Sequence, residues 1–198
     1  MGIFSKKAEP AEVFDAPTAA IEDISGDYSL DPAHTRLGFS ARHAMVTTVR
    51  GAFNQFEGTA HIDVQNPAGS KVSIKIDANS VDTGNKDRDG HLLSGDFFET
   101  AENPYITFES TAVAFDGETW EVTGDLTIKG VSHAVTVPFE LTGSAKDPFG
   151  NTRVGFEGAT SINRSDWGLA FNAALETGGV LVSEKIKLEF DISAIKTA

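Results

Sequence analysis

The sequence predicts an all-β protein: an extended, eight-stranded antiparallel barrel with one or two short helices, preceded by a disordered N-terminal tail. Apolar and polar residues alternate with a period of two in several segments, which is the pattern of a half-buried antiparallel strand. Turn residues such as Asp116-Gly117 and Lys129-Gly130 separate these segments, so consecutive strands are expected to pair. A closed barrel is favoured over an open sandwich because closure removes exposed strand edges.

The N-terminal residues 1–24 are rich in Ala, Glu, Asp and Pro, with only scattered apolar side chains. Such a segment cannot bury enough apolar surface to offset the entropy lost on ordering, so we expect a flexible acidic tail. The barrel domain is expected over residues 25–196. The sequence shows no secretory leader and no apolar run long enough to span a bilayer, which predicts a soluble cytoplasmic protein.

The strand segments follow from Gly26 onward, and they include one unusually long example. The alternation is clearest in residues 72–76, 120–128, 135–141 and 186–192. Pro138 lies inside one of these segments and lacks an N–H, so it predicts a strand edge or a bulge. The strand at 119–128 would be roughly 33 Å long. A barrel of such strands encloses a tall, narrow space that suits an elongated apolar molecule.

Residues 83–98 break the strand pattern. Asn85 or Asp87 can cap a short helix, and Leu93 and Phe97 would share its apolar face at i, i+4 spacing. A polar surface above an apolar underside is expected of the lid or rim of a cavity. An ordinary surface helix with a solvated charged face has the same pattern, and this stretch alone does not separate the two interpretations.

Composition excludes several classes of function. The formal net charge of −13 argues against nucleic acid or an anionic membrane surface as a partner, since both are polyanions. Cysteine is absent, so disulfides, thiol catalysis and thiolate metal sites are excluded. The segment from Asn85 to Asp96 resembles a calcium loop, but Asn and Asp stand where that loop requires Asp and Glu. We therefore expect no metal, no required cofactor and no catalytic residues.

Cationic side chains gather at three places: Arg42-His43 with Arg50, Arg88 with His91, and Arg164 beside Trp167. In so acidic a chain, each cluster taken alone is typical of simple ion-pair partners. Together they could form a rim that binds an anionic or carbonyl head group by charge-assisted hydrogen bonds.

The order of these motifs resembles the YceI-like family of lipocalin-like, polyisoprenoid-binding proteins. The similarity covers about residues 26–194, and no single motif in it is decisive, although the ordered set is specific. The matching motifs are Asp31-x-x-His34-Thr35-x-Leu37-x-Phe39-x-x-Arg42-His43, Val49-Arg50-Gly51-x-Phe53, Thr83 with Arg88-Asp89-x-His91-Leu92, Pro104-x-Ile106-Thr107-Phe108, Gly124-x-Leu126-x-Ile128-Lys129-Gly130 and Ile162-Asn163-Arg164-Ser165-Asp166-Trp167-Gly168.

The resemblance implies a barrel whose central apolar tunnel holds a long isoprenoid chain, such as that of a polyprenyl phosphate or an isoprenoid quinone. The protein would be a carrier, a store or a sequestering protein rather than an enzyme. Each buried methylene contributes about 0.8 kcal/mol, so the chain can supply large gross affinity. The expected head-group rim consists of Arg42, His43, Arg50, Arg88, Asp89, His91, Arg164, Asp166 and Trp167. The expected tunnel residues are Phe39, Phe53, Ile74, Ile76, Phe97, Phe108, Leu126, Ile128 and Phe156.

Two alternatives stay open. In the first, the same barrel is an enzyme that modifies a lipid head group, with His43 or His91 and Asp89 or Asp166 as its acid and base. In the second, side chains fill the interior and no lipid binds. The pattern also leaves open which alternate set of each strand faces inward. A transient membrane contact and a homodimer are further expectations.

Overall fold

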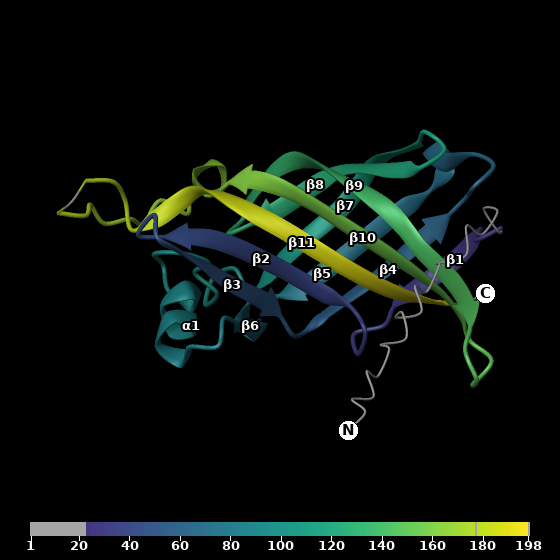
Figure 1. The fold of residues 1–198 in the computed structure, drawn as a ribbon, viewed down its shortest axis with the longest axis horizontal. Helices are drawn as coiled ribbons and strands as arrows, with labels where there is room; N and C mark the ends of the chain where they lie inside the picture. Colours follow the sequence, from purple (N-terminus) through teal and green to yellow (C-terminus); the bar gives the residue numbers. More distant parts are fainter. Residues whose placement is uncertain (1–22, 177, 198) are drawn as a thin grey trace, which may run out of the picture.

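The computed structural model describes residues 23–176 and 178–197, which form one elongated antiparallel barrel (Figure 1). The tail predicted at 1–24 lies, up to residue 22, outside the described residues. The strands are β1 Gly26–Leu30, β2 Arg36–His43, β3 Thr47–Phe53, β4 Phe56–Ile62, β5 Lys71–Asp77, β6 Val81–Asp82, β7 Tyr105–Phe115, β8 Thr119–Ile128, β9 Val131–Lys146, β10 Thr152–Asn163 and β11 Val182–Lys196.

These strands make an eight-stranded closed barrel because several are halves of one bent strand. Strands β1 and β2 both pair with β11, at Leu30↔Ala194 and Arg36↔Asp191, so together they cover a single edge of it. Strand β4 pairs with β1, and β3 pairs with β2. In the next position of the barrel, β5 pairs with β4 and β6 pairs with β3. The pairing of β1 with β11 closes the ring, which confirms the predicted architecture.

The alternation seen in the sequence sets which side chains face the interior. Along β8, Trp120, Val122, Leu126 and Ile128 are buried, and the polar residues between them are more exposed. Gly124 occupies an inward position in this series. A Cβ there would lie 2.5 Å from Cζ of Phe108, so glycine leaves room for the Phe108 ring in the core.

The ladder between β9 and β10 ends at the pair Phe139↔Gly158. Pro138 lies directly beyond this pair, and residues 131–138 of β9 continue beside β8 without a register to β10. This confirms the local strand edge that Pro138 predicts, since proline has no N–H to offer a further partner.

One α-helix, α1 (Lys86–Leu93), follows β6 and lies at one end of the barrel (Figure 1). Asn85 caps it, because its side-chain oxygen accepts the Arg88 backbone N–H at 3.0 Å. The helix ends at Leu93, so Phe97 reaches the core from the turn that follows rather than from the helix face expected of it. Three short 3-10 helices complete the described elements: η1 Pro67–Gly69, η2 Ala78–Ser80 and η3 Arg164–Trp167. None of the helices in the described ranges has the length and apolar composition needed to cross a bilayer.

The core consists of two clusters, one toward α1 and one toward the opposite end. The second cluster includes Ile24, whose carbonyl oxygen accepts the hydroxyl of the buried Tyr28 at 2.8 Å. Packing therefore extends to one residue before the predicted start of the domain.

A polar network tightens the end opposite α1. Arg153 donates to Asp31 at 2.5 Å and to Asp147 at 2.9 Å, and His34 lies 2.6 Å from the same Asp31 oxygen. The Arg153 hydrogen bond, followed by that of His34, lowers the pKa of Asp31 to about 2. The network ties the link between β1 and β2 to strand β10 and to the turn between β9 and β10.

Candidate ligand-binding cavity

Three cavities follow one another inside the barrel. The first, of about 520 Å³, lies beside α1 and is called the mouth cavity here. A middle cavity of about 100 Å³ shares Phe39, Phe53 and Leu188 with it, and a far cavity of about 90 Å³ shares Ile74 and Val122 with the middle one. Neighbouring cavities therefore have part of their lining in common.

The lining of all three cavities is predominantly apolar, and the structure places most of the predicted tunnel residues in it. Phe39, Phe53 and Phe97 line the mouth cavity. Ile74, Ile76, Phe108 and Leu126 line the middle cavity, and Phe156 lines the far one. Ile128 is buried in the core cluster near α1 but is not among the residues that line a cavity.

Arg164 is the most deeply buried of the charged residues predicted for the rim, with 4% of its surface exposed. It begins η3 and lines the mouth cavity. Its Nε donates to the carbonyl oxygen of Ser183 at 3.0 Å, and its Nη1 donates to that of Leu169. Within the described residues it forms no ion pair, although Glu184 lies near enough for the Arg164 charge to contribute to lowering the Glu184 pKa, after hydrogen bonds from Ser165. Among the described residues, this buried cation is hydrogen-bonded only to backbone carbonyls, at the wall of an apolar cavity.

Trp167 ends the same 3-10 helix and fixes its position. Its indole Nε1 donates to the backbone oxygen of Leu126 on β8 at 2.9 Å, and its ring meets that of His133 edge-on. Because Trp167 is buried and anchored, η3 holds Arg164 against the cavity rather than at the surface.

Helix α1 contributes two further predicted rim residues to the mouth cavity, Arg88 and His91. Arg88 donates from Nε to the Thr83 hydroxyl at 2.7 Å and from Nη2 to the Thr83 carbonyl at 2.8 Å. His91 lies 2.8 Å from Asp96, and its ring contacts those of Phe97 and Phe171 edge-on. The end of β2 supplies Arg42 and His43, which are exposed at the cavity entrance.

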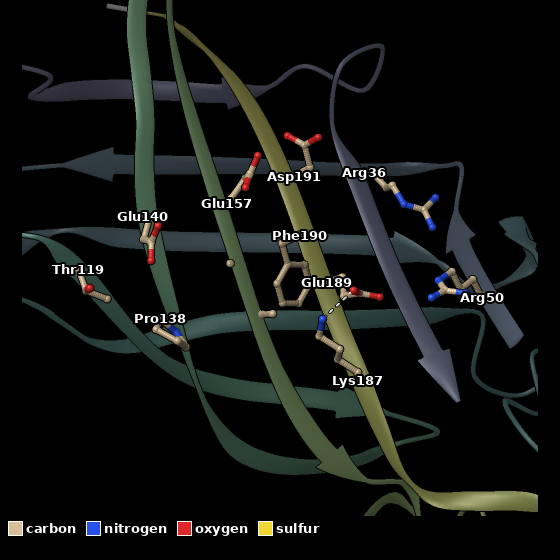
Figure 2. A pocket seen from close by; sticks show the side chains of 12 residues that line it. Arg36, Arg50, Thr119, Pro138, Glu140, Glu157, Lys187, Glu189, Phe190 and Asp191 are labelled. Carbon is tan, nitrogen blue, oxygen red and sulfur yellow. Dashed lines mark hydrogen bonds and ion pairs between the residues drawn. The ribbon is translucent and has the colours of Figure 1, made fainter. Parts of the chain in front are cut away.

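Three predicted rim residues do not line the mouth cavity. Asp89 accepts hydrogen bonds from the backbone N–H and the hydroxyl of Thr83, which is a role in holding α1. Asp166 is exposed, and its backbone oxygen accepts from His133 at 2.9 Å. Arg50 lies on the outer face of the barrel with Arg36, in a groove of about 620 Å³ shown in Figure 2.

The outer groove is chemically unlike the interior. Glu140 and Glu157 lie across it from the two arginines, and Asp191 is the register partner of Arg36. Between them on β11, Lys187 and Glu189 form an ion pair of 2.8 Å (Figure 2). Charges of both signs already face one another there. The groove therefore offers no single-sign site for an anionic head group.

The histidine–carboxylate pairs considered for an enzyme are not formed as expected. His91 pairs with Asp96 rather than with Asp89 or Asp166, and Asp89 is occupied by Thr83. In the part of the chain that the structure describes, no cluster of three or more His, Asp or Glu side chains is arranged to hold a metal ion.

A model of the YceI-like domain matches residues 28–194 of this chain. The chain belongs to the YceI-like family. A UPF0312 protein from Pseudomonas aeruginosa is 40% identical over 148 residues, which cover 74% of this chain and 78% of that protein.

Solved structures agree with this membership. BcnA of Burkholderia cenocepacia superposes with a TM-score of 0.73 at 27% identity, covering 83% of this chain and 98% of that one. A polyisoprenoid binding domain from Saccharophagus degradans gives a TM-score of 0.65 at 21% identity, over 86% of this chain and 98% of that domain, which shows a common fold.

The YceI-like mouth cavity also contains residues that sequence reasoning missed. Leu169 and Phe171 follow η3, Leu181 precedes β11, and Val182 is its first residue. The spacing of Leu169 and Phe171 is that of an inward-facing pair, which was the available signal. The signal is weak because, in its described residues, the segment between η3 and β11 forms an isolated bridge, Ala174↔Val180, and no continuous strand.

Proposed function

We propose that this protein binds an elongated isoprenoid-type lipid, with the chain in the successive cavities and an anionic or carbonyl head group at the mouth. In this proposal it acts as a carrier, a store or a sequestering protein. The observation that carries the proposal is Arg164, a buried cation without an ion-pair partner among the described residues, at the wall of an otherwise apolar cavity. Burying a charge that lacks a direct ion-pair partner is costly, and a bound anion or strongly polar oxygen would relieve that cost.

The shape of the interior supports an elongated rather than a compact ligand. The mouth cavity is far larger than the two behind it, and the three follow one another between shared side chains. A flexible prenyl chain can follow such a path by small rotations of the separating side chains. The apolar lining would stabilise the chain by about 0.8 kcal/mol for each buried methylene, from which the cost of ordering the chain is subtracted.

The family supports the same ligand class. The Saccharophagus degradans domain with the same fold is described as polyisoprenoid binding. A prenyl phosphate and an isoprenoid quinone share a long branched apolar chain and a polar head rich in oxygen acceptors. Arginine suits either head, because its guanidinium offers several donors in a fixed plane.

The proposal can be tested by comparing a polyprenyl phosphate with the uncharged polyprenol of the same length. The natural protein is expected to bind the phosphate at least about tenfold more tightly, which corresponds to one charge-assisted contact of about 1.4 kcal/mol. Arg164→Met should lower affinity for the phosphate and leave affinity for the alcohol nearly unchanged. Circular dichroism and thermal unfolding would establish that the variant is folded.

The matched control is Arg50→Met, since Arg50 lies in the outer groove and not in the cavity. It should bind both lipids as the natural protein does. Equal loss in both variants would mean that overall charge, and not the buried guanidinium, sets the preference. Mass spectrometry of lipid extracted from freshly purified protein would then identify the natural ligand; absence of binding to any prenyl lipid would contradict the proposal.

A further inference from the structure

We infer that the barrel end around the β2–β3 turn is a docking surface for a phospholipid bilayer, which rests on the proposed lipid-binding function. Three large apolar side chains are exposed there: Met45 at 60%, Val46 at 74% and Val180 at 40%. They are called the apolar tip below. Exposed apolar residues gathered at one place are typical of an interaction site, whereas isolated ones are ordinary.

The apolar tip is one structural unit although its residues come from distant parts of the sequence. The backbone N–H of Ala44 donates to the Leu181 carbonyl at 2.7 Å, which joins the turn to the chain entering β11. A Cβ built on Gly179 would lie 3.6 Å from Cγ of Met45. Met45 therefore packs close to the segment that presents Val180.

The turn itself uses residues that its backbone does not favour. Ala44 and Met45 have φ values of 49° and 60°, and Val46 N–H donates to the His43 carbonyl at 3.0 Å, as in a type I′ turn. Asn and Gly are preferred at these positions because they tolerate positive φ. An alanine and an exposed methionine there are locally unfavourable, and such exceptions are expected where a surface has a function.

Cationic side chains lie beside the apolar tip. Arg42 and His43 are the last two residues of β2, at this end of the barrel, and residues 42–56 contain no Asp or Glu. Arg42 donates to the carbonyls of Met45 and Val46, so its guanidinium lies directly beside the apolar tip. Cations next to exposed apolar groups are the usual composition of a surface that enters the head-group layer.

The local charge changes what the net charge of −13 implies. Acidic groups do occur at this end: Asp87 lines the mouth cavity, Glu176 lies in the segment with Val180, and Glu184 is bound by the Ser165 N–H. Charges farther from the apolar tip than about 8–10 Å are largely screened by salt. The protein would therefore contact a bilayer through the apolar tip, while the rest of the barrel stays away from the membrane surface.

The position of the apolar tip next to the mouth cavity favours a bilayer over a protein as its binding partner. Leu181 and Val182 line the mouth cavity, and Val180 precedes them in the chain, so the apolar tip continues into the cavity lining. Docking here places the entrance of an apolar cavity at the apolar layer of the membrane. A lipid chain could then pass between the two without crossing water.

The test uses the full-length protein and vesicles of phosphatidylcholine with a minor share of phosphatidylglycerol, in a sedimentation assay. The double variant Met45→Gln, Val46→Thr keeps side-chain size and removes apolar character. It should lower the partition coefficient at least about tenfold, because two side chains lose their transfer into the apolar layer. Affinity for a short prenyl phosphate in vesicle-free buffer should stay unchanged.

Phe149→Ser is the matched control. Phe149 is 89% exposed in the turn between β9 and β10, at the barrel end opposite α1 (Figure 1). This variant should bind vesicles as the natural protein does. Equal loss of vesicle binding in both variants would indicate unspecific adsorption and would overturn the inference. Absence of vesicle binding by the natural protein would overturn it as well. So would unchanged vesicle binding by the double variant, which is the result expected if the apolar tip binds a protein instead. Loss of prenyl phosphate binding in every variant would count against the proposed function rather than against docking.

Discussion

Asp89 accepts two hydrogen bonds from Thr83, one from the backbone N–H at 3.0 Å and one from the hydroxyl at 2.5 Å. Thr83 follows β6 and Asp89 lies on α1, so this pair fastens the helix to the barrel. Arg88 completes the contact by donating to the Thr83 hydroxyl and carbonyl. Since α1 supplies one wall of the mouth cavity, the attachment also sets how readily that wall moves.

Replacing Asp89 with Asn should loosen α1. Hydrogen bonds to a charged acceptor contribute about 1.5–3 kcal/mol each, and Asn retains only part of this. We expect unfolding free energy to fall by about 1–2 kcal/mol, and bound lipid to exchange several-fold faster. Urea unfolding and stopped-flow lipid exchange measure the two effects. Asp125→Asn, on the exposed face of β8, should change neither; an unchanged exchange rate in a destabilised Asp89 variant would show that α1 does not gate the cavity.

The Asp31 network predicts a loss of stability in acid. Asp31 has a folded-state pKa of about 2, which is lower than the value of about 3.9 for an unfolded chain. A depressed pKa stabilises the fold above about pH 4, and this contribution disappears as pH falls from about 4 toward 2. Hydrogen bonds from Asn151 and Arg153 lower the pKa of Asp147 as well. Protonation of either carboxylate in acid therefore removes stability from the fold.

Urea midpoints measured between neutral pH and about pH 2 should therefore fall for the natural protein. Asp31→Asn should be less stable at neutral pH, and its difference from the natural protein should shrink across the window from about 4 to about 2. A difference that stays constant over this window would show that the Asp31 charge does not contribute to stability.

Blocking the passage between cavities should set a limit on chain length. Val122 lines both the middle and the far cavity. Val122→Phe should fill this junction at a packing cost of about 1–3 kcal/mol. Long prenyl phosphates should then bind markedly more weakly, while short ones that fit the mouth and middle cavities keep their affinity. Titration with a series of chain lengths measures this; a uniform loss at every length would mean that long chains do not use the far cavity.

The two tryptophans can report ligand orientation. Trp167 lines the mouth cavity and Trp120 the far cavity, and both are buried. A quinone quenches tryptophan fluorescence at short range, so a quinone head at the mouth should quench Trp167 more than Trp120. Fluorescence of Trp120→Phe, which retains Trp167, is compared with that of the natural protein. Stronger quenching of Trp120 would place the head group at the far end.

The assignment of Arg50 to the head-group rim could have been corrected from the sequence alone. Arg50 and Phe53 lie three residues apart on β3, and residues at odd spacing on a strand face opposite sides. Placing Phe53 in the tunnel therefore requires Arg50 to lie outside, which is where the structure has it. The family motif that joins the two residues does not carry this distinction.

The sequence by itself determined the strands, the capped helix and part of the apolar lining, because alternation and turn chemistry are local properties. Only the tertiary structure decided which polar residues meet the cavity. Arg164 is buried there because Trp167, anchored to Leu126 forty-one positions away, folds η3 back against β8, and because Ser183 offers its carbonyl from β11. Contacts between residues so far apart depend on barrel closure and strand register, and these are fixed by packing of the whole chain rather than by any segment of it.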